Sequence, residues 1–219
     1  MADRLLLVEG EADRAFFELL CNSEAILEGG QVAPPVVVGG RKNTKQGVLN
    51  YLETLIGNLK DGRLRALAIV VDADRVADGG GFTKTVQQVT QKVSAEGYDT
   101  DPVSLGGGGL VYKHNDGLPD FGVWVMPDNA SEGTLEDWIK QSVLPAEHAL
   151  LAHAQNTVAN LSAPKFKANR LSKAEVATWL AWQEKPSEGL YFAVEGRLLD
   201  TTATLHTGLV QWLKAVFPD

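Results

Sequence analysis

Apolar runs typical of buried strands alternate with amphipathic helix patterns along the first 140 residues, and this alternation limits the folds open to the chain. The clearest run is RALAIVVDAD at residues 65–74, apolar almost throughout, as in a strand covered on both faces. Further strands are predicted at residues 5–10, 34–40 and 121–129, and helices at 11–22, 45–60, 82–97 and 135–143. The pattern predicts an α/β fold with a mainly parallel, doubly wound sheet, in which ligands bind at the carboxyl ends of the strands.

Beyond residue 140 the strand patterns fade and helical spacing of apolar residues takes over, at residues 144–161, 171–183 and 201–217. We therefore expect an α/β domain over residues 1–140 and a helical extension over 141–219 that packs on it. The glycine-rich stretches at residues 79–81 and 106–109 indicate loops or a hairpin turn, since no Lys-Ser or Lys-Thr follows to complete a P-loop.

Composition excludes several classes of protein. No apolar run approaches the roughly 18 residues of a membrane span, and the first residues do not have the pattern of a secretory signal, so we expect a cytoplasmic protein. The single cysteine, Cys21, cannot form an internal disulfide or a cysteine-rich zinc site. The four histidines show no spacing that indicates a zinc site.

Charge is distributed unevenly along the chain. Residues 1–140 hold 13 of the 20 basic and 21 of the 28 acidic side chains, a net charge of −8, while the rest of the chain is neutral. Such acidity indicates either a solvated surface that repels nucleic acid or carboxylates that converge on divalent cations. The one basic segment with an aromatic residue, KFKANRLSK at residues 165–173, is either a solvated linker or a phosphate-binding element, through Lys165, Lys167 and Arg170.

Acidic residues follow several of the predicted strands. Glu9 ends the first strand, Asp72 and Asp74 end the third, and Asp128 ends the fourth. Because the carboxyl ends of parallel strands meet at one edge of a sheet, these side chains should form one cluster. Two acidic residues of the following helices can join it, Asp13 and Glu136. Oxygen ligands favour Mg²⁺ or Mn²⁺.

Acidic residues near helix starts have a simpler explanation, because they stabilise the helix dipole. We prefer this explanation for Glu11 and Asp137, which open two predicted helices. For Glu9, Asp72 and Asp74 we prefer a functional role, because buried strands that end in carboxylates need a partner for them.

Three stretches, LLLVEG, IVVDAD and PDNASEGTLEDW, together resemble the TOPRIM fold in its OLD-nuclease-like branch, in particular the small standalone proteins of that branch. KAEVATWLAWQEKP and VQWLKAVF resemble the helical tail of those proteins. The resemblance implies that Glu9 is a metal ligand or general acid/base, that Asp72 and Asp74 are metal ligands, and that Asp13 and Glu136 bind a second metal.

The function that the resemblance implies is hydrolysis of a phosphodiester with two Mg²⁺ or Mn²⁺ ions about 3.5–4 Å apart. A lysine commonly neutralises transition-state charge in related nucleases, and Lys173 or Lys167 is the candidate here. OLD proteins join this domain to an ATPase, but the chain has no Walker motif, which leaves a separately encoded ATPase partner open.

Three alternatives remain open at the level of sequence. VVDADRV also fits an aspartate-dependent phosphatase, in which Asp72 attacks phosphate and Asp74 acts as acid and base. A receiver domain clusters acidic residues similarly but leaves Glu136 and the helical tail unexplained. A non-catalytic module that binds metal or nucleotide is the alternative outside the enzymes. The sequence does not decide between DNA, RNA and a nucleotide as substrate, nor whether the protein is an oligomer.

Overall fold

A computed structural model describes residues 3–36 and 44–218 of the chain. The described part has an α/β fold around a sheet of strand order β2-β1-β3-β6-β5-β4, as the alternation predicts. Four neighbouring strands are parallel: β2 (Gln31–Ala33), β1 (Arg4–Leu7), β3 (Ala66–Asp72) and β6 (Phe121–Met126). The antiparallel strands β5 (Gly109–Tyr112) and β4 (Val103–Leu105) complete one edge.

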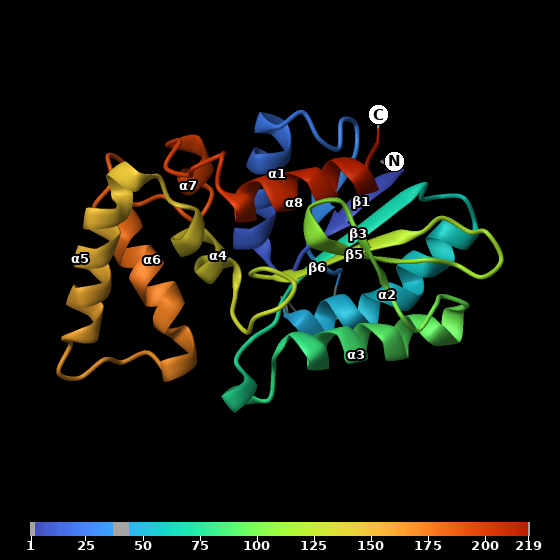
Figure 1. The fold of residues 1–219 in the computed structure, drawn as a ribbon, viewed down its shortest axis with the longest axis horizontal. Coiled ribbons are helices and arrows are strands. Elements are labelled where there is room, and N and C mark those ends of the chain that lie inside the picture. Colours follow the sequence, from blue (N-terminus) through green and yellow to red (C-terminus); the bar gives the residue numbers. More distant parts are fainter. Residues whose placement is uncertain (1–2, 37–43, 219) are drawn as a thin grey trace.

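Helices cover both faces of the sheet, which explains why β3 is apolar almost throughout (Figure 1). One face is covered by α2 (Lys45–Lys60) and α3 (Phe82–Val93), and the other by α1 (Glu11–Ser23) and α8 (Thr204–Val216). Alternate residues of β3 enter the two cores, Ile69 that of α2 and α3 and Val70 that of α1 and α8. Each core therefore depends on the sheet and on helices from distant parts of the chain.

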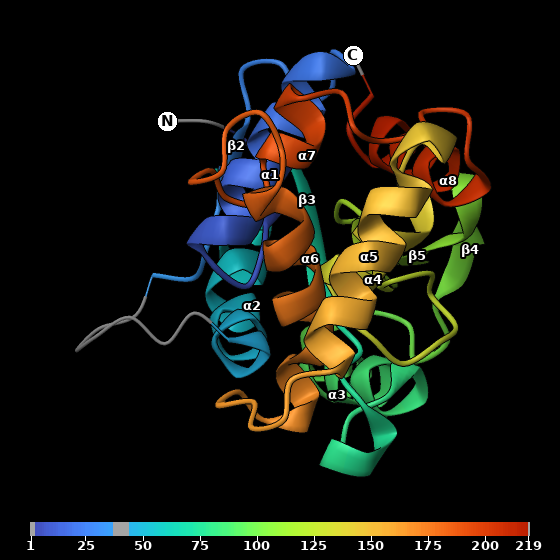
Figure 2. The same cartoon turned by 90° about the vertical axis from the view of Figure 1, so that its left-hand side faces the viewer.

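The remaining helices lie beside one end of the sheet: α4 (Leu135–Ser142), α5 (His148–Ala159), α6 (Leu171–Ala181) and α7 (Phe192–Glu195). Helices α5 and α6 pack side by side, and α6 also contacts α4 (Figure 2). The three long C-terminal helices begin and end within a few residues of the predicted bounds. None of the helices in the described ranges combines the length and the hydropathy that crossing a bilayer requires.

The second strand differs from its predicted position. It spans Gln31–Ala33, whereas the prediction was residues 34–40. Pro34 and Pro35 carry no backbone N–H and cannot donate to a strand ladder, so the described strand ends before them. Residues 37–40 of the prediction lie outside the described residues.

The glycine run after β4 forms the hairpin turn that was one of its two predicted conformations. Gly107 has a φ of +67°, and a Cβ there would lie 1.8 Å from the carbonyl oxygen of Gly208 in α8. A Cβ on Gly109 would lie 2.0 Å from the Trp212 ring. The glycines thus allow α8 to pack directly on the hairpin. The hairpin strands themselves were not predicted, because each is only three or four residues long.

Candidate functional site

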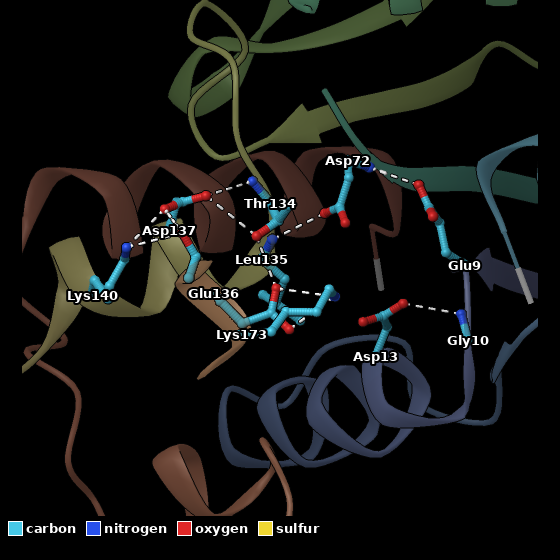
Figure 3. Close-up of polar contacts among 11 residues, drawn as sticks. Glu9, Gly10, Asp13, Asp72, Thr134, Leu135, Glu136, Asp137, Lys140 and Lys173 are labelled. Carbon is cyan, nitrogen blue, oxygen red and sulfur yellow. Dashed lines mark hydrogen bonds and ion pairs between the residues drawn. The ribbon is translucent and has the colours of Figure 1, made fainter. Parts of the chain in front are cut away.

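The carboxyl ends of β1 and β3 lie next to each other, as expected for neighbouring parallel strands. Glu9 follows β1 and Asp72 is the last residue of β3. The Asp72 N–H donates a hydrogen bond of 2.9 Å to Glu9 Oε1, so the two strand ends are joined directly (Figure 3). Two acidic side chains 63 residues apart in sequence therefore share one site.

A polar cleft of about 700 Å³ opens at these strand ends. The first turns of α1, α2 and α4 contribute to its walls, together with α6. The cleft brings together six of the residues predicted for the site: Glu9, Asp13, Asp72, Asp74, Arg170 and Lys173.

Asp13 and Asp72 are each held by a backbone N–H. Asp13 Oδ2 accepts a hydrogen bond of 2.9 Å from Gly10, and Asp72 Oδ1 accepts one of 2.9 Å from Leu135, the first residue of α4. Both side chains extend toward the Lys173 ammonium group (Figure 3). The backbone thus fixes the carboxylates around a point at which positive charge is already present.

The environment of the cleft disfavours ionised carboxylates. Burial raises the pKa of Glu9 to about 7, and repulsion from Asp74 and Asp13 adds to the effect. Burial also raises the pKa of Asp13 to about 6, with repulsion from Glu136. The pKa of Asp72 is raised well above its ordinary value by burial and then by Glu9. A bound cation would relieve this repulsion.

Lys173 interacts electrostatically with three of the carboxylates, those of Glu136, Asp72 and Asp13. Its Nζ lies 3.0 Å from Glu136 Oε1, and Glu136 itself is only 3% exposed. Thr134 Oγ1 donates a further hydrogen bond of 2.8 Å to Glu136 Oε2. Although burial lowers the pKa of Lys173, the charges of Glu136 and Asp72 outweigh burial and raise it. Lys173 therefore stays protonated over the physiological range.

The basic segment before α6 contributes only its last part to the cleft. Arg170 is exposed and lines the cleft with Lys173. Lys165 and Lys167 are exposed and are not among the cleft-lining residues. Of the two lysines considered as catalytic, Lys173 is thus the one that the fold places beside the carboxylates.

Asp128 does not join the cluster, contrary to the sequence prediction. Its Oδ1 accepts hydrogen bonds from the backbone of Ala130 (3.0 Å) and of Ser131 (2.6 Å). Burial raises the pKa of Asp128, but these hydrogen bonds outweigh it and lower the pKa overall. Strand β6 ends at Met126 and not at residue 129 as predicted, so Asp128 lies in the turn beyond the strand. Its hydrogen bonds stabilise that turn.

Helix starts account for the two acidic residues assigned to them. Glu11 pairs with Arg14 within the first turn of α1, at 2.6 Å. Asp137 Oδ2 accepts a hydrogen bond of 3.0 Å from the N–H of Thr134, the residue before α4. Both contacts lie within one helical turn, and Asp137 Oδ1 also accepts a hydrogen bond of 2.6 Å from Ser172 Oγ of α6.

Lys45 is a cleft residue that sequence patterns did not reveal. It is the first residue of α2, and its Nζ lies 2.6 Å from Asp74 Oδ2. The sequence indicates only a helix start after Thr44, which caps α2 through its side chain. The contact with Asp74 depends on the tertiary placement of α2 against β3, which no local pattern encodes.

The donor set fits a divalent cation in chemistry but is not preassembled around one. Within residues 3–36 and 44–218, no three acidic, histidine or cysteine side chains form a group that could hold a metal ion. Two of the carboxylates, Asp74 and Glu136, are instead paired with lysines. The donors are nevertheless carboxylate oxygens, which Mg²⁺ and Mn²⁺ prefer, and burial raises the pKa of three of them.

The family model described as "Protein of unknown function (DUF3226)" matches residues 3–218. The chain belongs to this family. The match spans the α/β part and the C-terminal helices together, so the cleft lies within the region that defines the DUF3226 family. Neither a curated protein nor a solved structure matches the chain.

Proposed function

We propose that this DUF3226 protein is a cytoplasmic, divalent-metal-dependent phosphodiester hydrolase that acts on nucleic acid or a nucleotide. The observation that carries the proposal is the junction of Glu9 with Asp72 at the ends of neighbouring parallel strands, with Asp13 and Lys173 beside them. The sequence resemblance to the OLD-nuclease-like branch of TOPRIM proteins supports the same assignment and is compatible with a separately encoded ATPase partner.

Five carboxylates would hold two Mg²⁺ or Mn²⁺ ions: Glu9, Asp13, Asp72, Asp74 and Glu136. Bound divalent ions supply Lewis acidity and lower the pKa of bound water. Since Glu136 is paired with Lys173 and Asp74 with Lys45, ion binding requires these lysines to share or release their carboxylates.

The residues of the chain supply the remaining parts of the reaction. Glu9, which accepts a hydrogen bond from the Asp72 N–H at the strand ends, would act either as a metal ligand or as the general base that takes a proton from an attacking water. Lys173, kept protonated by the neighbouring carboxylates, can stabilise the charge that develops on the phosphoryl oxygens. Arg170 can bind the phosphate from the exposed rim of the cleft.

A second candidate is a module that binds a cation or nucleotide without cleaving it. The observation that favours it is the pairing of Asp74 and Glu136 with lysines, which neutralises part of the site in the absence of a ligand. The aspartate-dependent phosphatase also remains a proposal, with Asp72 as the nucleophile.

The test compares hydrolysis of single-stranded DNA, bis(p-nitrophenyl) phosphate and p-nitrophenyl phosphate by the purified protein with Mn²⁺, Mg²⁺ or EDTA. We expect metal-dependent cleavage of the two diesters, with a loss of about a hundredfold or more in Glu9→Gln and in Asp72→Asn. The matched control is Glu18→Gln, a partly exposed acidic residue of α1 that pairs with Arg14.

Each outcome separates the candidates. Cleavage of the monoester alone would favour the phosphatase. Binding of Mn²⁺ without cleavage of any substrate would favour the binding module. Equal activity in Glu9→Gln and the parent protein would exclude the site as the source of cleavage.

A further inference from the structure

The ammonium group of Lys45 lies at the end of β3, where it contacts more acceptors than it has protons. It donates to the carbonyl oxygens of Asp72 (2.9 Å) and Ala73 (3.1 Å) and to Thr85 Oγ1 (3.2 Å), and it pairs with Asp74 Oδ2 at 2.6 Å. The side chain is 14% exposed. A lysine has three N–H donors, so these four acceptors leave none for a substrate.

Two of the acceptors are backbone carbonyls of the residues that lead from Asp72 to Asp74. These carbonyls lie where β3 leaves the sheet, and Ala73 O also accepts a hydrogen bond of 2.8 Å from the Gly81 N–H. The third acceptor belongs to Thr85 of α3, a residue with 0% exposure. Lys45 therefore connects α2, α3 and the end of β3, and its contact with Asp74 is one of four.

The segment after β3 is narrowly constrained on its other sides. Asp74 has a φ of +59°, a conformation that side-chain-bearing residues rarely adopt. Its N–H donates to Gly133 O at 2.9 Å, which joins it to the loop before α4. A Cβ on Gly80 would lie 2.6 Å from Ala73 O, so that glycine permits the chain to return against the turn. Lys45 contacts this turn through two of its backbone carbonyls and through the Asp74 carboxylate.

We propose that Lys45 is a positioning residue, which fixes Asp74 relative to Asp72 so that both carboxylates face the cleft. The inference rests on the proposed function and deepens it, because it assigns the spacing of two proposed metal ligands to a residue outside the ligand set. Thr85 acts through Lys45: its buried hydroxyl contacts both Lys45 Nζ and Ala73 O, and it does not line the cleft.

Lys45 could instead compete with a bound cation for Asp74, and the two roles predict opposite effects of removing the lysine. A lysine that merely competed with a cation for Asp74 would weaken metal binding, and its removal would tighten that binding. A positioning lysine has the reverse effect, since its removal frees the turn. Thr85→Val removes the Thr85 contact of Lys45, and with it the longer contact of Thr85 with Ala73 O, without changing the charge of the site.

The experiment measures Mn²⁺ affinity by isothermal titration and diester hydrolysis for the parent protein, Lys45→Met, Thr85→Val and Thr85→Ser. Lys60→Met is the matched control, at the other end of α2, where Lys60 pairs with Glu96 on the surface. Circular dichroism and melting curves identify any variant that fails to fold.

We expect Mn²⁺ affinity to fall about tenfold or more in Lys45→Met, the range typical of residues that orient metal ligands, and by a smaller factor in Thr85→Val. Thr85→Ser should restore affinity, and kcat should fall more than KM rises. Unchanged or tighter Mn²⁺ binding in both Lys45→Met and Thr85→Val would overturn the inference, as would a parent protein that binds no Mn²⁺. Mn²⁺ binding with the expected losses but no hydrolysis would overturn the proposed hydrolase and leave the positioning role supported.

Discussion

Glu9, a partly buried residue, links the site to the stability of the protein. Its pKa is about 7 in the folded chain against an ordinary value of 4.5, so between these values the folded state binds more protons than the unfolded state. Stability therefore falls as pH rises from about 4.5 to 7 without metal, and a shift of this size corresponds to a change on the order of 3 kcal/mol.

Replacing Glu9 with Gln should flatten this dependence and make the variant more stable than the parent protein at pH 8 in EDTA. Urea unfolding at pH 5, 6, 7 and 8 measures the effect, with Glu18→Gln as the control on the same side of the sheet. Parallel profiles of stability against pH for Glu9→Gln and the parent protein would contradict a raised pKa of Glu9 in the folded chain.

The sequence predicted which site residues lie together where the strand order alone determines their positions. Glu9 and Asp72 could be placed together because neighbouring parallel strands end at one edge of a sheet. Lys45 could not be found, since its contacts depend on how α2 approaches β3 in space. Asp128 was misassigned because its oxygens find closer donors within the turn after β6.

Helices α4 and α6 are joined by a polar network that supports the placement of Lys173. Lys140 of α4 lies 2.7 Å from Glu175 and 3.0 Å from Asp137, and it donates to Ser172 at 3.0 Å. Glu175 is 8% exposed, so it needs a partner. Since Ser172 precedes Lys173, the network holds the start of α6 against the cleft.

Lys140→Met should destabilise the protein by about 2 kcal/mol, because it leaves charged hydrogen-bond partners unsatisfied. Lys185→Met, which removes an exposed pair with Glu195, should cost less than about 1 kcal/mol. Tryptophan fluorescence during urea unfolding measures both, since Trp179 lies in α6. Equal effects of the two substitutions would show that the network does not anchor α6.

Helices were predicted more closely than strands at the scale of elements. The apolar spacing of α2 predicts its span of Lys45–Lys60 without error, because one continuous face is buried. The hairpin of β4 and β5 gave no periodic signal over so few residues. The described second strand ends at Ala33, before the predicted start at residue 34, because Pro34 and Pro35 cannot donate to a ladder.

The acidic α/β part of the molecule, residues 1–140, and the neutral helical part, residues 141–219, both contribute residues to the cleft. Glu9 and Asp72 come from the sheet, whereas Lys173 and Arg170 come from the helical part. The α8 helix also belongs to the core of the sheet, since Leu209 and Trp212 pack in one cluster with Val70. The predicted boundary at residue 140 thus marks a change from alternating strand and helix patterns to helical patterns alone. The cleft is lined by residues from both sides of this boundary.

The central claim, that the strand-end carboxylates bind divalent cations, is tested most directly by diffraction from crystals soaked in Mn²⁺. We predict anomalous difference peaks in contact with Glu9 and Asp72, accompanied by movement of Lys173 away from Glu136, and no such peaks in crystals of Asp72→Asn. Crystals in which Mn²⁺ occupies no position in the cleft, with Glu136 still paired to Lys173 and Asp74 to Lys45, would contradict the account.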